Sequence, residues 1–281
     1  MGLYPEGIGY GERAQKIAES YPSDQYLFFK SLGGLCYIYN GQGKIKNIFD
    51  GAKRLLDYGE KTANNRSTVF GHWMNGWGHH LAGDLESAQK SFKKAVDVAL
   101  DPAYAQFPKC TLCLVYCLSG QFQEAENVAQ SIFDFSKKRD IGQLTGFAYL
   151  SKAFSLIVKG QMNEGFRMFQ ETQQVFIKND KKTWYAISEL TLGGIYSQMA
   201  SETSSAFKKA EEHLNKSIEV SREIGATGTL GRAYLSMGLL QKGMEKTDQA
   251  KEFLSNAIDI FEELNMEFFM KQAKEALASI E

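Results

Sequence analysis

The sequence predicts an all-α protein: an α-α superhelix of about six stacked helical hairpins, preceded by a half-repeat and followed by a capping helix. Glycine turns with similar following residues recur at Gly43, Gly83, Gly120 and Gly160, which are 40, 37 and 40 residues apart. After these turns, apolar or small residues return at intervals of four and three, the spacing of one helix face. The 281 residues contain only four prolines, so little interrupts long helices. Because such arrays grow by stacking, we expect residues 1–281 to form a single superhelical domain.

The N-terminal part of the chain has two predicted pieces. Residues 7–11 are rich in glycine, and we expect them to be a linker. Residues 10–24 look like the second helix of a hairpin whose first helix is missing. Such a half-repeat exposes an apolar face that a neighbour should cover. We therefore expect the chain to be the C-terminal portion of a longer protein.

Six hairpins are expected next, each with an apolar first helix and an amphipathic second helix. The fifth carries extra residues in its turn, at 201–206, which should lengthen a loop or a helix end. A lone helix over residues 266–281 places Phe269, Ala273, Ala276 and Ile280 on one face, and should cap the last hairpin. The predicted hairpins are residues 25–62, 66–101, 103–139, 142–179, 183–224 and 228–264.

Small residues mark where the two helices of a hairpin should approach each other closely. In the second hairpin Ala88, Phe92 and Ala95 share one stripe, with the aromatic side chain filling space beside the small ones. Larger residues stand at the corresponding small positions of the first hairpin, at Ile48, and of the third, at Cys113. We expect these two hairpins to be looser or longer.

The pattern is most regular in the last hairpin, where Gly238 precedes Ala250 by twelve residues and Leu254 and Ala257 follow. In these residues, and across nearly the whole chain, the units resemble tetratricopeptide repeats. The resemblance implies a superhelix whose first helices line a concave surface. Because the repeat occurs in many unrelated proteins, it specifies a fold more than a role.

Two segments resemble a narrower group of arrays. They are His72-x-x-x-Gly76 with the following residues 81–88, and residues 231–238. Both are similar to the tetratricopeptide regions that trail the ATPase part of bacterial adenylate and guanylate cyclases and of maltose-regulator-type transcription factors. This resemblance implies that the array senses a ligand or partner and regulates an output domain. An upstream catalytic domain of the same polypeptide is then one possible partner.

Composition excludes several classes of partner. The chain has 32 basic and 33 acidic residues, so no overall field attracts nucleic acid. No apolar run approaches the roughly 20 residues that cross a bilayer, so no membrane partner is expected. The N-terminus resembles no secretion signal, which predicts a cytoplasmic location. Three of the four cysteines lie in one apolar segment, as reduced core thiols do.

The main candidate binding surface is an apolar strip on the first helices of the second, third and fourth hairpins. On the first of these, Trp73, Trp77 and His80 fall at i, i+4 and i+7. Such a strip suits an amphipathic helix or an apolar ligand, and tryptophan is enriched where partners dock. The alternative is packing between repeats, since apolar stripes usually belong to the core. The next two helices add Phe107, Cys110, Leu114, Cys117, Phe147, Leu150 and Phe154.

Metal and catalytic chemistry are not expected. His72, His79 and His80 could meet the thiols of the next repeat in a zinc site, but cysteines within an apolar helix behave as small core residues. We therefore predict no metal and no cofactor. The sequence has no Gly-x-Ser-x-Gly elbow, no His-Glu-x-x-His motif and no phosphate loop. We accordingly predict that the protein is not an enzyme.

The function predicted from sequence is a scaffold that binds a protein or peptide partner, as a regulatory or sensor module of a larger signalling protein. One alternative is a small-molecule sensor whose ligand changes the superhelical pitch, because each repeat interface is a small hinge. The other is a platform for self-assembly through the exposed half-repeat.

Overall fold

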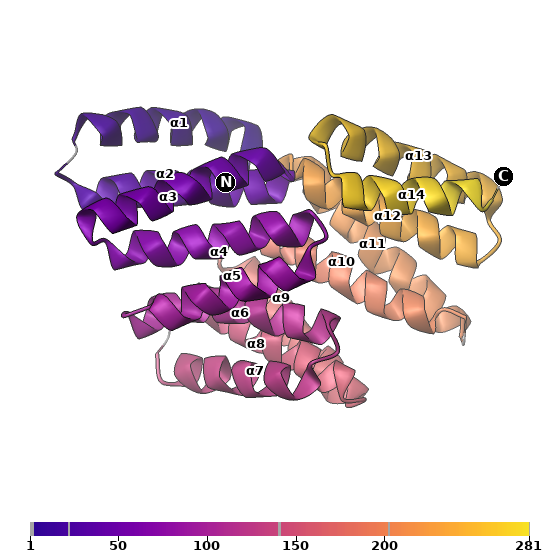
Figure 1. The fold of residues 1–281 in the computed structure, drawn as a ribbon. Helices are drawn as coiled ribbons and strands as arrows, with labels where there is room; N and C mark the ends of the chain where they lie inside the picture. Colours follow the sequence, from indigo (N-terminus) through magenta and orange to yellow (C-terminus); the bar gives the residue numbers. More distant parts are fainter. Residues whose placement is uncertain (1–2, 22, 140–141, 202, 281) are drawn as a thin grey trace.

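The chain folds into consecutive helical hairpins, which confirms the predicted all-α superhelix. The computed structural model describes residues 3–21, 23–139, 142–201 and 203–280, and this part of the chain contains fourteen helices (Figure 1). Helix α1 comes first, α2 to α13 pair into six hairpins, and α14 comes last. Their bounds are α1 Tyr4–Ser20, α2 Gln25–Gln42, α3 Ile45–Thr62, α4 Asn65–Leu81, α5 Leu85–Val98, α6 Pro102–Leu118, α7 Phe122–Lys137, α8 Gly142–Val158, α9 Met162–Lys178, α10 Lys182–Met199, α11 Ser204–Ile224, α12 Thr227–Gly243, α13 Thr247–Leu264 and α14 Glu267–Ala278.

The predicted glycine turns separate the two helices of the first four hairpins. Gly43, Gly83, Gly120 and Gly160 have φ angles of 73°, 84°, 71° and 81°. This left-handed conformation ends a helix and is strained for residues with a Cβ. Because the turn needs it, glycine recurs at the same place in each of these hairpins.

The fifth hairpin accommodates its extra residues mainly in a helix. Helix α11 has 21 residues and is the longest of the fourteen. It begins after Thr203, whose Oγ1 accepts a hydrogen bond from the Ala206 amide at 3.1 Å. This cap satisfies one of the free amides of the first turn.

The predicted linker at residues 7–11 is wrong, because these residues lie within α1. Pro5 stands in the first turn of this helix, where its missing N–H costs no hydrogen bond. Gly7 and Gly11 face α2: a Cβ on Gly7 would lie 3.1 Å from Ile38 Cδ1, and one on Gly11 would lie 2.5 Å from Leu35 Cδ2. The glycines therefore allow close packing of α1 on α2, and the half-repeat begins at Tyr4 and not at residue 10.

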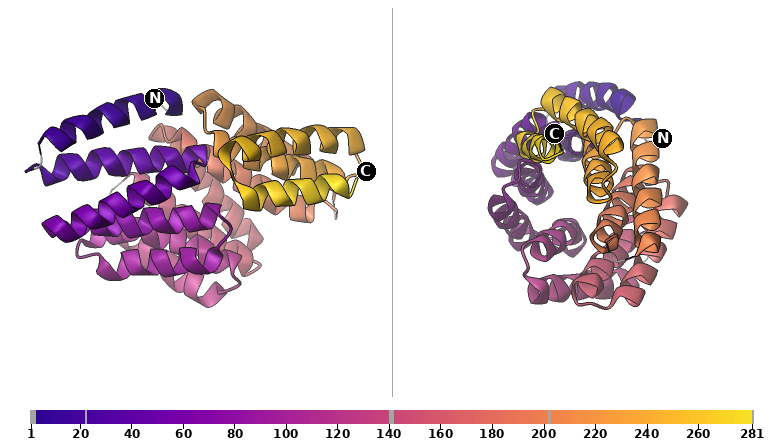
Figure 2. Two further views of the ribbon diagram at one scale, coloured as in Figure 1. Left: turned by 45° about the horizontal axis from the view of Figure 1, so that its top comes forward. Right: turned by 90° about the vertical axis from the view of Figure 1, so that its right-hand side faces the viewer.

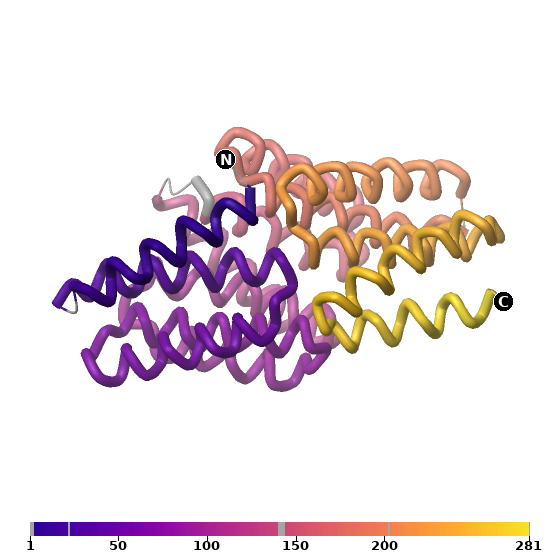
Figure 3. Tube along the Cα trace, turned by 90° about the horizontal axis from the view of Figure 1, so that it is seen from above, coloured from indigo at the N-terminus to yellow at the C-terminus, as the bar shows by residue number. Residues whose placement is uncertain are grey.

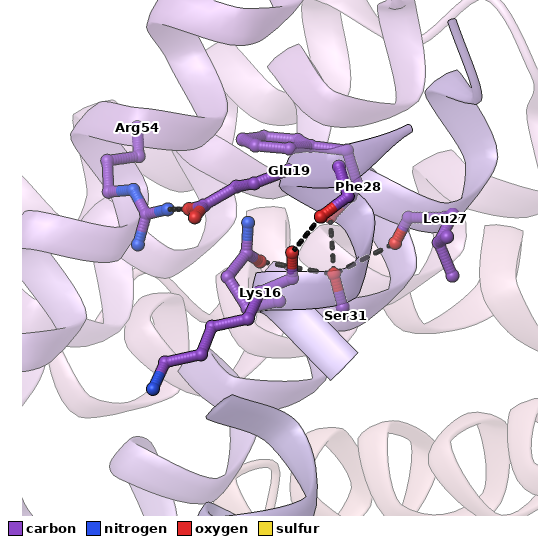
Figure 4. A network of polar contacts seen from close by, with 8 residues as sticks. Lys16, Glu19, Leu27, Phe28, Ser31 and Arg54 are labelled. Atoms are coloured by element: carbon purple, nitrogen blue, oxygen red, sulfur yellow. Dashed lines mark hydrogen bonds and ion pairs between the residues drawn. The ribbon is translucent and has the colours of Figure 1, made fainter. Parts of the chain in front are cut away.

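Polar contacts join α1 to the first hairpin as well (Figure 4). Arg54 of α3 donates to Glu19 of α1 at 2.8 Å. Ser31 of α2 donates to Gln15 of α1 at 3.1 Å and to the Leu27 carbonyl of its own helix at 2.9 Å. Both hydrogen-bond and apolar contacts therefore hold α1 as part of the array.

Glycines and alanines bring the helices of the regular hairpins close together, as predicted. A Cβ on Gly76 of α4 would lie 2.5 Å from the Phe92 ring of α5, and one on Gly238 of α12 would lie 2.7 Å from Leu254 of α13. The first and third hairpins, which carry Ile48 and Cys113, pack less extensively than the other four. Larger side chains at the contact keep those helices further apart.

The array curves until its last hairpins return beside its first (Figure 2). Helix α12 packs against α2, and a Cβ on Gly228 would lie 2.6 Å from the backbone nitrogen of Gly43. The N-terminal end of α1 lies beside α10 to α12 (Figure 3): the hydroxyls of Tyr4 and Thr183 are 2.6 Å apart, and Tyr4 packs with Ile224. The even-numbered helices form the inner layer of this ring, since α2, α4, α6 and α8 contact one another in turn, as do α10, α12 and α14.

Helix α14 covers the last hairpin, where a capping helix is predicted. Phe269 lies 5.6 Å from Phe261 of α13, measured between ring centroids, and Ala273 is fully buried. The helix also reaches the second hairpin, because Phe268 lies against Gly83. Within the described residues, no helix combines the length and apolar character that a membrane crossing requires.

Candidate binding site

The predicted apolar strip comes together inside the ring. It lies on α4, α6 and α8, and it meets α10 from the opposite wall. Eight of its ten residues line one enclosed cavity of about 40 Å³, room for no more than a few water molecules. These eight are Trp73, Trp77, Phe107, Cys110, Leu114, Phe147, Leu150 and Phe154.

The tryptophans of this middle part of the strip are closely packed. Trp73 and Trp77 are only 2% and 5% exposed. The Trp73 indole donates to Thr111 Oγ1 at 3.1 Å, and Phe147 meets Trp184 of α10 edge to face, with 4.5 Å between ring centroids. Packing, the alternative to a binding surface, therefore describes Trp73, Trp77 and Phe147. The other five residues that line this cavity are half-buried: Phe107, Cys110, Leu114, Leu150 and Phe154. Whether any of them also contacts a partner stays a prediction.

The two remaining strip residues lie apart from this cavity. His80 is buried against Trp77, and burial, together with the nearby charge of Arg232, lowers its pKa to about 3, so it is neutral at physiological pH. Cys117 is half-buried with a free thiol, and a hydrogen bond with the Cys113 side chain lowers the pKa of Cys117. Within the described residues, no three His, Cys, Asp or Glu side chains are placed to hold a metal ion.

An open cavity that the sequence did not indicate lies beside the closed one. Its volume is about 390 Å³, within the range of small-ligand pockets. Trp73 and Phe107 line both cavities and separate them. The open cavity is formed by α2, by the N-terminal halves of α4 and α6 and by one residue of α8. Its lining residues are Phe29, Lys30, Gly33, Gly34, Tyr37, Phe70, Trp73, Ala103, Tyr104, Phe107 and Leu144.

Contacts between aromatic side chains make the wall of the open cavity rigid. The Phe70 ring meets Phe29 edge to face at 5.1 Å and Trp73 at 5.0 Å between centroids. Such perpendicular pairs are favourable beyond the area they bury. Because each ring is held by another helix, the wall is formed before any ligand arrives.

Two cationic side chains lie near the mouth of the open cavity. Lys30 is exposed and its ammonium lies 5.6 Å from the centre of the Phe29 ring. Arg66 lies over the Tyr104 ring at 4.8 Å and pairs with Asp101. The site thus combines an apolar interior with cationic groups near its mouth.

Two features of this region were missed from sequence, and each had a signal. Trp184 is the third tryptophan of the chain and lies in the first turn of α10. It faces the interior of the ring, where it contacts Trp77 and Phe147. The sequence Leu-Gly-Gly occurs at residues 32–34 and again at 192–194. In both copies the second glycine, Gly34 or Gly194, has nothing within 4 Å of where its Cβ would be, so it leaves open space above the helix.

Comparisons with known proteins agree with this architecture. Residues 231–263, in the last complete hairpin, match the tetratricopeptide repeat family. The chain folds as a tetratricopeptide-repeat array. No curated protein is close enough in sequence to count as a relative.

Three solved structures resemble the tetratricopeptide array over most of its length. A signal transduction ATPase with a tetratricopeptide repeat sensor from Pyrococcus horikoshii is 13% identical, with a TM-score of 0.62 over 99% of this chain and 42% of that one. A Rap protein complexed with Competence and Sporulation Factor is 13% identical, with a TM-score of 0.57 over 95% and 81%. A tetratricopeptide repeat protein from Parabacteroides merdae is 14% identical, with a TM-score of 0.52 over 94% and 91%. The array spans less than half of the ATPase, and at these identities the likeness concerns the fold.

Proposed function

We propose that the array is a binding module that holds a short peptide segment of a partner protein in the open cavity of α2, α4 and α6. The observation that carries the proposal is the 390 Å³ cavity, whose lining is apolar or aromatic except for Lys30. An apolar side chain of the peptide fills the cavity. An acidic group next to it lies near Lys30 and Arg66 at the mouth, where opposite charges favour association.

The module binds rather than catalyses in this proposal, because aromatic rings and aliphatic groups make up most of the lining. The wider role is that of a sensor or regulatory part of a larger signalling protein. Two structural neighbours support it: one is named for its tetratricopeptide repeat sensor, and the other is a Rap protein complexed with a factor.

Filling the cavity tests the proposal. In Gly34→Trp the new side chain occupies the open space above α2, where no atom lies within 4 Å of the added Cβ. Peptides selected from a random library against the wild-type protein should carry an aromatic or large aliphatic anchor. They should lose at least tenfold in affinity for Gly34→Trp, about 1.4 kcal/mol, measured by fluorescence polarisation.

The matched control is Gly194→Trp. Gly194 follows the same Leu-Gly motif in α10 and also has open space above it, but it lines a different hollow between α10 and α12. The selected peptides should bind this variant like wild type. Equal binding to Gly34→Trp and wild type would contradict the proposal. If no peptide is selected but small apolar molecules bind and lose affinity in Gly34→Trp, the site senses small molecules, and the peptide proposal is wrong.

A further inference from the structure

A second, smaller cleft lies where the two ends of the array meet. It is formed by α2 and α4 from the first two hairpins and by α10 and α12 from the fifth and sixth. Tyr37 lines both this cleft and the open cavity, while Trp77 and Trp184 separate it from the closed one. Its polar or hydrogen-bonding lining residues are Tyr37, Asn40, Trp77, Thr183, Trp184, Thr229 and Arg232.

Arg232 supplies a positive charge to this cleft without a matching negative one. Among the described residues no carboxylate forms an ion pair with it, and no acidic residue lines the cleft. Its guanidinium lies 5.5 Å from the centre of the Phe269 ring. Burial lowers the pKa of Arg232 to about 10, so it still carries its charge at neutral pH. A half-buried cation is stabilised when an anion lies next to it.

Two residues that line the cleft have hydrogen-bond donors without acceptors. Trp77 and Trp184 are each 5% exposed, and neither indole N–H has an acceptor among the described residues. An indole nitrogen can only donate, and a buried donor without an acceptor costs free energy. The third tryptophan differs, because the Trp73 indole is bonded to Thr111.

We propose that this cleft binds a small oxyanion, a carboxylate or a phosphate, through Arg232 and the indole N–H groups of Trp77 and Trp184. The free volume of about 10 Å³ is that of one water-sized atom. The anion therefore enters with one oxygen, and its remaining atoms lie at the mouth beside the half-buried Arg232. Charge-assisted hydrogen bonds from a guanidinium are well suited to such oxygens.

The cleft lies between the two ends of the array. Its donors come from α4 at one end of the array and from α10 and α12 at the other, so a bound oxyanion connects the two ends. Anything that binds only the closed ring stabilises it. This cleft shares Tyr37 with the peptide cavity, but its oxyanion-binding groups lie outside that cavity and do not depend on the function proposed for it.

The three tryptophan indoles allow a direct test on the wild-type protein. Sodium phosphate, and separately sodium acetate, is titrated at constant ionic strength against a sodium chloride reference, and the indole signals are followed by ¹H–¹⁵N NMR. The Trp77→Phe and Trp184→Phe variants assign the signals. We expect the Trp77 and Trp184 signals to shift and saturate with at least one of the two anions, while the Trp73 signal stays in place. A response to phosphate alone or to acetate alone identifies the type of oxyanion.

Charge variants complete the test. Arg232→Gln should abolish the saturable shifts, whereas Arg167→Gln, which removes a surface arginine of α9, should leave them unchanged. Absence of saturable shifts in the wild type overturns the proposal, as does an equal response of all three indoles or an undiminished response in Arg232→Gln. Should Arg232→Gln not fold, the wild-type titration with Trp73 as internal reference still decides.

Discussion

At the scale of single residues, the packing of the inner helices depends on which positions carry glycine, the residue without a Cβ. Gly76 and Gly194 are both interior to a first helix of a hairpin, yet their surroundings differ. The Phe92 ring occupies the space beside Gly76, while nothing lies within 4 Å of a Cβ at Gly194. The same residue type therefore has a packing role at one position and leaves open space at the other.

Gly76→Ala tests the packing role. The added methyl group would lie 2.5 Å from the buried Phe92 ring, and overpacking of this kind costs about 1–3 kcal/mol. Gly194→Ala is the control, where the higher helix propensity of alanine should stabilise by up to about 1 kcal/mol. Urea unfolding followed by circular dichroism measures both. If Gly76→Ala were as stable as wild type, close contact between α4 and α5 would not be what selects glycine.

At the scale of elements, turn and cap residues determine where each helix begins and ends. Gly83 ends the turn after α4 in the left-handed conformation, and Asp84 next to it caps α5. Asp84 Oδ1 accepts a hydrogen bond from the Ser87 amide at 2.9 Å. The hydrogen bonds from Ser87 lower the pKa of Asp84 below its ordinary 3.8, because they favour the charged carboxylate.

The cap of α5 gives a pH-dependent prediction. A carboxyl with a lowered folded pKa contributes stability that is present above its unfolded pKa and is lost as pH falls through the folded value. Asp84→Ala should therefore cost about 1 kcal/mol near pH 7, and the difference from wild type should shrink below about pH 4.

Asp84→Asn separates the cap from its charge. Asparagine caps about as well as aspartate but does not titrate, so its advantage over Asp84→Ala should persist at low pH. Thermal unfolding of the three proteins between pH 3 and pH 7 provides the measurement. A constant difference between wild type and Asp84→Ala over this range would show that the carboxylate does not act through its charge.

At the scale of the whole molecule, the ring depends on contacts between its two ends. One of them is the backbone contact of α12 with the turn after α2, where glycine stands on both sides at Gly43 and Gly228. A Cβ at Gly228 would meet the Gly43 nitrogen at 2.6 Å and its Cα at 2.7 Å. Backbone atoms cannot turn away as a side chain can, so this contact permits no larger residue.

Gly228→Ala should therefore open the ring. We expect α12 to separate from α2, with a larger radius of gyration by small-angle X-ray scattering and a loss of stability of about 1–3 kcal/mol. Gly243→Ala, at the other end of α12 and without atoms within 4 Å of the new Cβ, should leave the radius of gyration unchanged and should not lower the stability. Unchanged scattering by Gly228→Ala would mean that other contacts close the ring.

The sequence by itself determined the hairpins of this protein, because they depend on local signals. Turn glycines, apolar spacing and small residues at helix contacts act over one or two helices, so their pattern predicted the superhelix, the lengthened fifth hairpin and the capping helix. The strip on α4, α6 and α8 was also predictable, since it follows from helical register. The glycines of α1 were misinterpreted because their partners, Ile38 and Leu35, lie on another helix.

Only the tertiary structure decided how far the array curves and what its interior contains. The curvature is the sum of small rotations at each repeat interface. Local sequence patterns do not predict that total. It brings Gly228 to Gly43 and Trp184 to Trp77, which are more than a hundred residues apart in sequence. This closure packs Trp184 against the middle of the predicted strip, leaves an open cavity beside Gly34, and places Arg232 in a cleft that Trp77 and Trp184 also line. The binding sites proposed for this protein therefore arise from long-range packing, whereas its repeats arise from local sequence.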